Sequence, residues 1–367
     1  TDIPEADMIE YLRREEVPVV DGQIQVPSWR PDLRCMADIA EEVARYYGYN
    51  NIATTLMRGT TTRGGYSDTA MLENQAGAAA RSLGYSEIIT YSFVSPASFD
   101  AVRIPKDSPL RRTLKLVNPL GEDTSIMRTI ILPSMLDILS RNYAMKNKGV
   151  KLYELGRVYL PVEGQDLPEE PRHLIFGTYG EHETFFSMKG EVDALLELLN
   201  VKPAEYVANR ENPSYHPGRC ADILIDGKVA GTIGQVHPLV AETYGIGGEV
   251  YVADLDFTAI EASLAEERVF HSLPRFPAVT RDLALVCDEA LTVGELERCI
   301  SGVAGKLLRK INLFDIYRGP GIAPGKKSVA FSLELRADDR TLTDEDSTGV
   351  VDKVLKALKE EKNVTLR

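Results

Sequence analysis

The clearest hydrophobic pattern lies near the end of the chain. Residues 329–335 alternate apolar and polar side chains, which is typical of a strand with one buried face. Apolar residues recur at helical spacing in 351–358, after a Thr-x-x-Asp capping box at Thr343. A second capping box at Thr292 opens another helix. Three further apolar runs predict strands: 283–287, 311–317 and 363–367. The order β-α-β-β-α-β predicts a ferredoxin-like domain.

The middle of the chain mixes helices with strands. Helical periodicity predicts three helices: 71–83, 134–145 and 184–199. Apolar and alternating runs predict six strands: 88–93, 151–159, 174–179, 221–225, 229–235 and 250–256. The strands follow one another in runs and do not alternate with helices. This order favours an α+β domain built on an antiparallel sheet.

The first fifty residues predict a small module of their own. Helical patterns cover 5–14 and 38–47, and QIQV at 23–26 is typical of an extended ribbon. The second helix is expected to end at Gly48. This order favours a small winged or three-helix module. Residues 53–65 are rich in Thr and Gly and predict a linker. We therefore expect three domains: 1–52, 66–267 and 273–367.

Composition narrows the class of protein. The 367 residues are 44% hydrophobic and 26% charged, which excludes a fibrous or wholly disordered chain. No apolar stretch reaches the roughly 20 residues of a membrane helix, so we expect no membrane partner. The four cysteines form no Cys-x-x-Cys pair, which argues against a disulfide framework and favours the cytoplasm. The opening TDIPEADMIE lacks an initiator Met and the features of a signal peptide, so we expect a fragment or a processed chain.

Charge is distributed unevenly. The net charge of −13 argues against bulk attraction of nucleic acid, but residues 269–367 carry 16 basic and 15 acidic side chains, a net of +1. Basic and aromatic residues lie together there, and such a surface can hold RNA by phosphate contacts and stacking. The candidate RNA-binding residues are Lys310, Tyr317, Arg318, Lys326, Lys327, Arg336 and Arg340. The alternative is a solvated sheet edge guarded by lysines.

Four carboxylates form the densest chemical cluster: Asp32, Asp38, Glu41 and Glu42. On a helix that begins near Asp38, the residues three and four positions on share its face, where like charges repel. A hard divalent cation such as magnesium would relieve that repulsion. Alternatively, Asp38 and Glu41 cap the helix and Glu41 pairs with Arg45 one turn on. The residues alone leave both interpretations open.

The common catalytic motifs are absent from the sequence. It contains no G-x-S-x-G, no H-E-x-x-H and no G-x-G-x-x-G after a strand. The Gly- and Pro-rich stretch at 319–326 lacks the spacing of a phosphate loop and predicts a hairpin turn. We therefore predict no catalytic residue and no cofactor-binding loop in this chain.

Three groups of long motifs go beyond composition. The first is VPSWRPDLR at 26–34 followed by DIAEEVARYYGYNNI at 38–52. The second is NPLGE at 118–122, MRT at 127–129, LPSML at 132–136 and LYELGRVY at 152–159. The third is RFPAVTRDLAL at 275–285, LFDIYRG at 313–319 and RTLTDE at 340–345. Together, and in this order, they resemble the beta chain of bacterial phenylalanine–tRNA ligase.

The resemblance implies the C-terminal portion of that beta chain. It implies a truncated B5-like domain, a class II synthetase-like core without catalytic residues, and a ferredoxin-fold anticodon-binding domain. The partners would be the alpha subunit, in an α2β2 tetramer, and phenylalanine tRNA. The alpha subunit would bind ATP and phenylalanine, and the assembly would use magnesium. The family's editing domain lies outside the match, so no editing activity is expected.

The resemblance also assigns individual residues. The four clustered carboxylates fall on the family's magnesium-binding positions. Glu154 and Arg157 look like remnants of a strand-loop-strand unit, and we assign them to structure. The alternative function is a stand-alone RNA-binding adaptor built from synthetase-derived domains.

Overall fold

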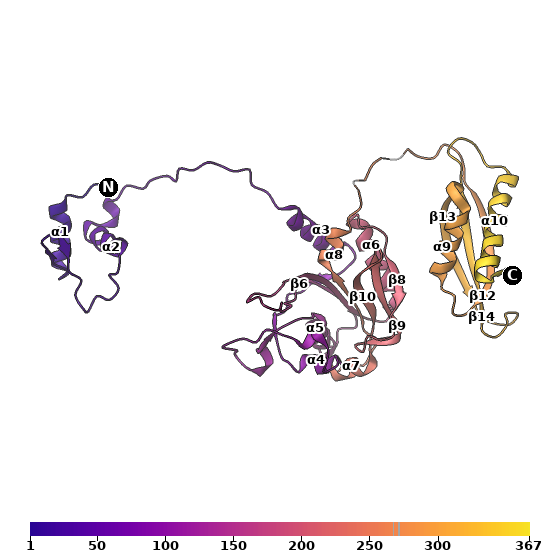
Figure 1. Cartoon of the computed structure of the whole chain (residues 1–367), viewed down its shortest axis with the longest axis horizontal. Coiled ribbons are helices and arrows are strands. Elements are labelled where there is room, and N and C mark those ends of the chain that lie inside the picture. The colour runs from indigo at the N-terminus through magenta and orange to yellow at the C-terminus, as the bar shows by residue number, and fades with distance from the viewer. Residues whose placement is uncertain (267, 271) are drawn as a thin grey trace. The chain divides into compact units, whose positions relative to one another are not determined.

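The structure is a computed structural model that describes residues 1–266, 268–270 and 272–367 (Figure 1). The chain divides into two compact units, Thr1–Ser263 and Leu264–Arg367. The predicted α+β class is confirmed, because the chain combines helices with largely antiparallel sheets. No helix within the described residues is long and apolar enough to cross a membrane. All four cysteines are free.

The first two helices share a small hydrophobic core. They are α1 (Glu5–Arg14) and α2 (Met36–Tyr47). Five buried side chains form the core: Leu12, Val17, Leu33, Ile39 and Val43. The predicted ribbon is shorter than expected, since only β1 (Val19–Val20) and β2 (Gln23–Ile24) pair.

Local backbone geometry explains the turn and the helix end in this region. Asp21 and Gly22 join β1 to β2 with φ angles of 49° and 75°, and two consecutive positive φ angles are typical of a type I′ hairpin turn. Helix α2 ends at Gly48, as predicted, where φ is 93° and a side chain would be strained. A short 3₁₀ turn, η1 (Tyr49–Asn51), follows.

A seven-stranded sheet forms the centre of the first unit. Its spatial order is β3-β6-β7-β11-β10-β9-β8, and every neighbouring pair is antiparallel except β3 with β6. The strands are Ser86–Glu87 (β3), Val150–Arg157 (β6), Arg172–Tyr179 (β7), Glu205–Ala208 (β8), Tyr215–Ile225 (β9), Lys228–Val236 (β10) and Tyr251–Asp256 (β11). Five of the six strands predicted for the middle of the chain correspond to β6, β7, β9, β10 and β11.

Helices cover both faces of this sheet. One face packs against α3 (Asp68–Ser82), α6 (Phe185–Leu198) and α8 (Phe257–Ala262). The other packs against α5 (Leu132–Ala144) and α7 (Pro238–Thr243). Side chains alternate between the two cores along a strand, so Ile175 and Phe176 of β7 belong to different clusters. Gly177 lets α5 approach closely, because a Cβ there would lie 2.6 Å from the Met135 sulfur.

The prediction of a strand at 88–93 is wrong. The chain leaves the sheet after β3, and the next strand is β4 (Phe93–Val94), which pairs with β5 (Ile126–Met127) in a separate two-stranded sheet. Residues 88–92 alternate apolar side chains, but those of Ile89 and Tyr91 point to solvent. The exposed side of this segment carries the apolar pair, whereas Ile88 packs against the core and Thr90 reaches Glu154. Short helical turns complete this unit: α4 (Ser98–Ala101), η2 (Pro109–Arg111) and η3 (Glu122–Thr124).

The second unit has the predicted β-α-β-β-α-β order. Its elements are β12 (Val279–Asp288), α9 (Val293–Ala304), η4 (Gly305–Leu307), β13 (Leu308–Tyr317), β14 (Lys326–Leu335), α10 (Asp344–Lys362) and β15 (Thr365–Leu366). The sheet order β13-β14-β12-β15 is entirely antiparallel, and both helices pack into one core with it. The capping boxes at Thr292 and Thr343 are both present, which confirms the two predicted helix starts.

Candidate functional sites

Asp38, one of the four predicted metal ligands, caps helix α2. Its Oδ2 accepts hydrogen bonds from the backbone N–H groups of Arg34 at 2.7 Å and Cys35 at 2.9 Å. These backbone bonds hold the pKa of Asp38 below its ordinary value. The capping box joins Cys35 to Asp38, whereas the sequence suggested Asp38 with Glu41. Helix α2 consequently starts at Met36, two residues earlier than predicted.

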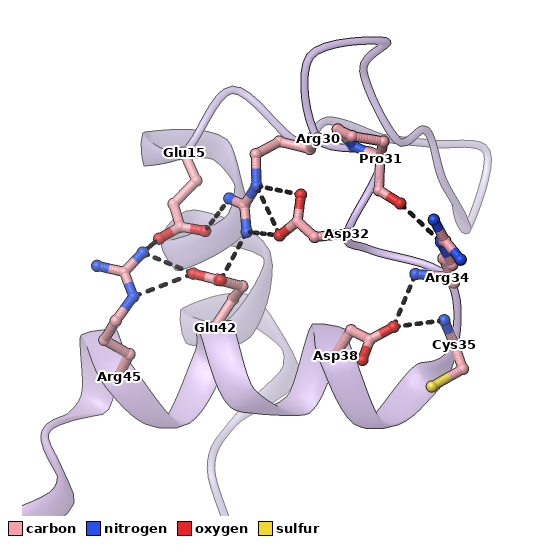
Figure 2. Close-up of polar contacts among 9 residues, drawn as sticks. All are labelled: Glu15, Arg30, Pro31, Asp32, Arg34, Cys35, Asp38, Glu42 and Arg45. Carbon is pink, nitrogen blue, oxygen red and sulfur yellow. Dashed lines mark hydrogen bonds and ion pairs between the residues drawn. The ribbon is translucent and has the colours of Figure 1, made fainter. Parts of the chain in front are cut away.

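Arg30 binds two of the other predicted ligands at once (Figure 2). Its Nη2 lies 2.8 Å from Asp32 Oδ2 and 2.7 Å from Glu42 Oε1. The hydrogen bonds to both carboxylates raise the pKa of Arg30 above its ordinary value, and the same contact lowers the pKa of Asp32. A guanidinium of the chain itself therefore relieves the expected repulsion between these carboxylates.

Glu15 completes the network and was not found by sequence reasoning. Its side chain is 4% exposed and lies between Arg30, at 3.5 Å, and Arg45. Arg45 also contacts Glu42 at 2.6 Å, so the predicted pairing of Arg45 with Glu41 is wrong. The cause is tertiary, because Glu15 follows a different helix and draws Arg45 toward it. No spacing in the sequence signals such a contact.

The four predicted ligands have the chemistry that magnesium prefers, but their arrangement suits the ion less well. Carboxylate oxygens are the donors that magnesium prefers. Within the described part of the chain, however, no group of three or more His, Cys, Asp or Glu side chains could hold a metal ion. Asp32 and Glu42 contact Arg30, Asp38 faces the backbone, and Glu41 is exposed. A metal that used all four side chains would have to displace Arg30.

A buried ion pair lies in the core of the first unit. Arg128, 2% exposed, lies 3.0 Å from Glu154, which is 3% exposed. Arg128 Nη1 donates to Thr90 Oγ1 at 2.7 Å, and Thr90 Oγ1 donates to Glu154 Oε2 at 2.7 Å. Arg128 Nε donates to the carbonyl of Arg157 at 2.8 Å. A buried pair is tolerated when its remaining donors and acceptors are satisfied in this way. Glu154 thus has a structural role, as predicted.

A wide cleft borders residues 88–92, which we call the edge segment. Its volume is about 1040 Å³, and residues of the edge segment and of helix α5 line it. Ile89 and Tyr91 stand on its wall and are 90% and 84% exposed. Neighbouring apolar side chains at the mouth of a cleft are typical of an interaction surface. Val117 and Leu120, in the loop before β5, are also almost fully exposed.

Most of the predicted RNA-binding side chains in the second unit have acidic partners. Arg318 lies 2.8 Å from Glu289, Lys326 lies 3.3 Å from Asp288, and Arg340 lies 3.0 Å from Asp346. Arg336 pairs with Glu334. Lys310 is exposed on β13, which forms one edge of the sheet. A cation with an acidic partner attracts a phosphate more weakly than a free one.

Two of the predicted RNA-binding residues are less accessible than the sequence suggested. Lys327 is 6% exposed and donates to the carbonyl of Glu289 at 3.0 Å. The burial of Lys327 could have been predicted from the sequence. Lys327 lies two and four residues before the buried Val329 and Phe331, so its side chain is on the same face of the strand. The ring of Tyr317 is covered by the Arg367 guanidinium, 4.9 Å from its centroid. Phe314, 55% exposed, is the aromatic ring that β13 leaves open.

Comparisons with known proteins cover the whole chain. Family models match residues 1–49, described as the tRNA synthetase B5 domain, residues 52–257, the phenylalanyl tRNA synthetase beta chain CLM domain, and residues 274–367, the ferredoxin-fold anticodon binding domain. The last match agrees with the ferredoxin-like topology of the second unit.

Curated relatives share one name, phenylalanine–tRNA ligase beta subunit. The proteins of Clostridium tetani and Clostridium acetobutylicum are 41% and 40% identical over all of this chain, and that of Bacillus subtilis is 38% identical over 94% of it. The chain spans about half the length of these relatives, 47%, 47% and 44% respectively. The resemblance inferred from the motifs is confirmed, and the chain belongs to the phenylalanyl-tRNA synthetase beta chain family.

Proposed function

We propose that this chain works as the C-terminal part of a phenylalanine–tRNA ligase beta subunit. In this role it supports the ATP-dependent attachment of phenylalanine to its tRNA without catalysing the reaction. The observation that carries the proposal is the identity of about 40% to beta subunits over the full length of the chain. The alternative, an RNA-binding adaptor without a synthetase partner, has no support in the names of these relatives.

The three predicted domains would divide this work. Residues 1–52 would hold magnesium, residues 66–267 would dock the alpha subunit, and residues 273–367 would contact the anticodon region of phenylalanine tRNA. Support for the boundaries comes from the family models, which cover residues 1–49, 52–257 and 274–367. The antiparallel sheet of the middle part is the feature that a class II synthetase-like core would need.

The cleft beside the edge segment is the best candidate for docking the alpha subunit. A name that contains "beta subunit" describes one chain of an assembly. Ile89, Tyr91, Val117 and Leu120 are apolar side chains that water surrounds in this chain alone. Burying them against a partner would contribute roughly 25 cal/mol for each Å² of apolar surface removed from water. The alpha subunit would bring the ATP and phenylalanine sites, for which this sequence has no motif.

The magnesium site would be completed only in the assembly. Asp32, Asp38, Glu41 and Glu42 would hold the ion, together with waters or ligands from the alpha subunit. A bound Mg²⁺ would supply a hard positive centre that attracts these carboxylates. Arg30 would then have to release Asp32 and Glu42. The double variant Glu41→Gln/Glu42→Gln should reduce the dependence of tetramer assembly on magnesium, and an unchanged dependence would favour capping and ion pairing alone.

The RNA contact would rest on few side chains. Lys310 is exposed, and Arg318, Lys326, Arg336 and Arg340 could exchange their acidic partners for phosphates. We leave Lys327 and Tyr317 out of this set because of their burial and covered ring. Each phosphate contact to a single strand contributes about −0.7 to the slope of log affinity against log salt. Few contacts therefore predict weak binding by this domain on its own.

A pair of assays tests the proposed function. The chain alone should show no phenylalanine-dependent ATP–pyrophosphate exchange. In an assembly with the alpha subunit, removal of residues 273–367 should weaken tRNA charging and leave pyrophosphate exchange nearly intact, since adenylation needs no tRNA. Equal losses in both assays would mean that these residues support the fold of the assembly and do not contact RNA.

A further inference from the structure

The edge segment is held in place differently from the strands around it. Its two ends have backbone hydrogen bonds, from Ile88 N to the Tyr153 carbonyl at 2.8 Å and from Arg128 N to the Ser92 carbonyl at 2.9 Å. Between these ends Thr90 contacts the core, because its backbone N–H and its hydroxyl both donate to Glu154. The middle of the segment therefore depends on one side-chain network and on no strand ladder.

That network is buried and charged. Glu154 and Arg128 together surround the Thr90 hydroxyl, which donates to the carboxylate and accepts from the guanidinium. Hydrogen bonds to charged groups are stronger than neutral ones, and a low local dielectric strengthens them further. Hydrophobic side chains of similar size would fill the same space, yet they could not fix the direction of a neighbouring hydroxyl.

The position of Thr90 decides where its two neighbours point. Along an extended segment successive side chains alternate, so a Thr90 that faces inward turns Ile89 and Tyr91 outward. Both of these side chains are exposed and line the cleft. Without the inward anchor, a one-residue slip would turn Thr90 out and the apolar pair in.

We propose that Arg128, Glu154 and Thr90 are positioning residues that present Ile89 and Tyr91 to the alpha subunit. This inference rests on the proposed function, because it takes the cleft as the docking site. The ion pair would touch neither tRNA nor substrate. It would lower the entropic cost of docking by holding the edge segment in its bound form before the partner arrives.

The test uses Thr90→Val, a substitution that keeps the β-branched shape and replaces the hydroxyl by a methyl group. Thr178→Val is the matched control, since Thr178 is also a threonine of this unit whose hydroxyl bonds a backbone carbonyl, that of Val150 at 2.9 Å. Each full chain is titrated with a phenylalanine–tRNA ligase alpha subunit. Amide hydrogen exchange of residues 88–92 and urea unfolding are measured on the same chains without the partner.

Thr90→Val should raise the dissociation constant about fivefold or more and speed amide exchange at 88–92 by a similar factor. Thr178→Val should change neither, although it also lowers the urea midpoint. Faster exchange with an unchanged dissociation constant would overturn the inference, and so would unchanged exchange.

A third variant separates this inference from the proposed docking site. Ile89→Ser/Tyr91→Ser removes the apolar pair and keeps the anchor. It should weaken binding of the alpha subunit more than Thr90→Val does. If this variant binds as tightly as the unaltered chain, the cleft is not the docking site and the proposed function fails at that point. If it weakens binding while Thr90→Val does not, only the positioning role fails.

Discussion

The Arg30 network and the Arg128–Glu154 network of the first unit differ chiefly in their contact with water. Arg30 is 23% exposed, and its partners Asp32 and Glu42 are 58% and 13% exposed. The side chains of Arg128 and Glu154 are 3% and 4% exposed. Water can replace Asp32 beside Arg30 at little cost, whereas a lost partner in the Arg128–Glu154 pair leaves a buried charge, as it would for Glu15, whose side chain is 4% exposed. The first arrangement can therefore exchange its cation, and the second can only hold its neighbours in place.

Removal of the buried Arg128 charge should have the largest effect on the stability of the first unit. Arg128→Met leaves the Glu154 carboxylate buried without a counter-charge, which should lower the free energy of unfolding of the core by about 3–5 kcal/mol. Urea unfolding followed by far-UV circular dichroism measures the loss. The double variant Arg128→Met/Glu154→Leu should recover most of it. Equal stability of the single and double variants would show that the pair is not electrostatically isolated from water.

Removal of one charge from the Arg30 network should cost less stability, because Arg30 and Arg45, the partners of Glu15, keep contact with water. Glu15→Gln keeps the shape of the side chain and removes the charge between Arg30 and Arg45, which should destabilise the first two helices by about 1.5–3 kcal/mol. Trp29 is the single tryptophan of the chain, so its fluorescence follows this region alone. Glu16→Gln, at an exposed neighbouring position, is the control. Matching losses in both variants would contradict the role given to Glu15.

The two networks also show which features the sequence could predict. Local signals were reliable: the capping boxes at Thr292 and Thr343 start helices, and the alternation at 329–335 is a half-buried strand. The contacts of Glu15 and the pairing of Arg128 with Glu154 could not be predicted, because they join residues far apart in the chain. Nothing local separates a buried arginine from an exposed one until its neighbours are known.

The prediction of a strand in the edge segment is wrong for a different reason. Its apolar run predicts a strand of the middle domain, but the side chains of Ile89 and Tyr91 are exposed. Periodicity reports that one side of a segment avoids water and does not say whether this chain or another covers it. An apolar pattern without a partner within its own fold is thus itself a sign of an interaction surface.

Another ion pair of the first unit has intermediate exposure, and its contribution to stability should depend on pH. His173 Nδ1 lies 2.7 Å from Asp254 Oδ1, with side chains 24% and 19% exposed. Burial lowers the pKa of His173, but the charge and hydrogen bond of Asp254 outweigh it and raise the pKa above 6.5. Because the folded pKa lies above the unfolded one, the pair contributes its full stability below pH 6.5 and loses it as pH rises through the folded pKa.

Urea unfolding of the core between about pH 5.5 and 8.5 should reveal this loss. His173→Gln should flatten the profile over that window. A His173→Gln chain with the same pH profile as the unaltered chain would mean that other groups set the dependence.

The smallest expected effect is that of salt. Raising NaCl from about 0.1 M to 1 M shortens the Debye length from roughly 10 Å to 3 Å and weakens exposed ion pairs much more than buried ones. Unfolding followed by Trp29 fluorescence should shift to lower urea, while the unfolding of the core should not, once general salt effects are subtracted with Glu15→Gln. A larger shift in the core would reverse the ranking of the two networks.

The most direct test of the account is co-expression of this chain with a phenylalanine–tRNA ligase alpha subunit, followed by size-exclusion chromatography with light scattering. The central claim is that the chain serves as a docking subunit of the ligase. It predicts one peak that contains both chains, with a mass above that of either alone, and a loss of this peak with Ile89→Ser/Tyr91→Ser. Separate peaks for the two unaltered chains would contradict the claim and favour an adaptor that works without a synthetase.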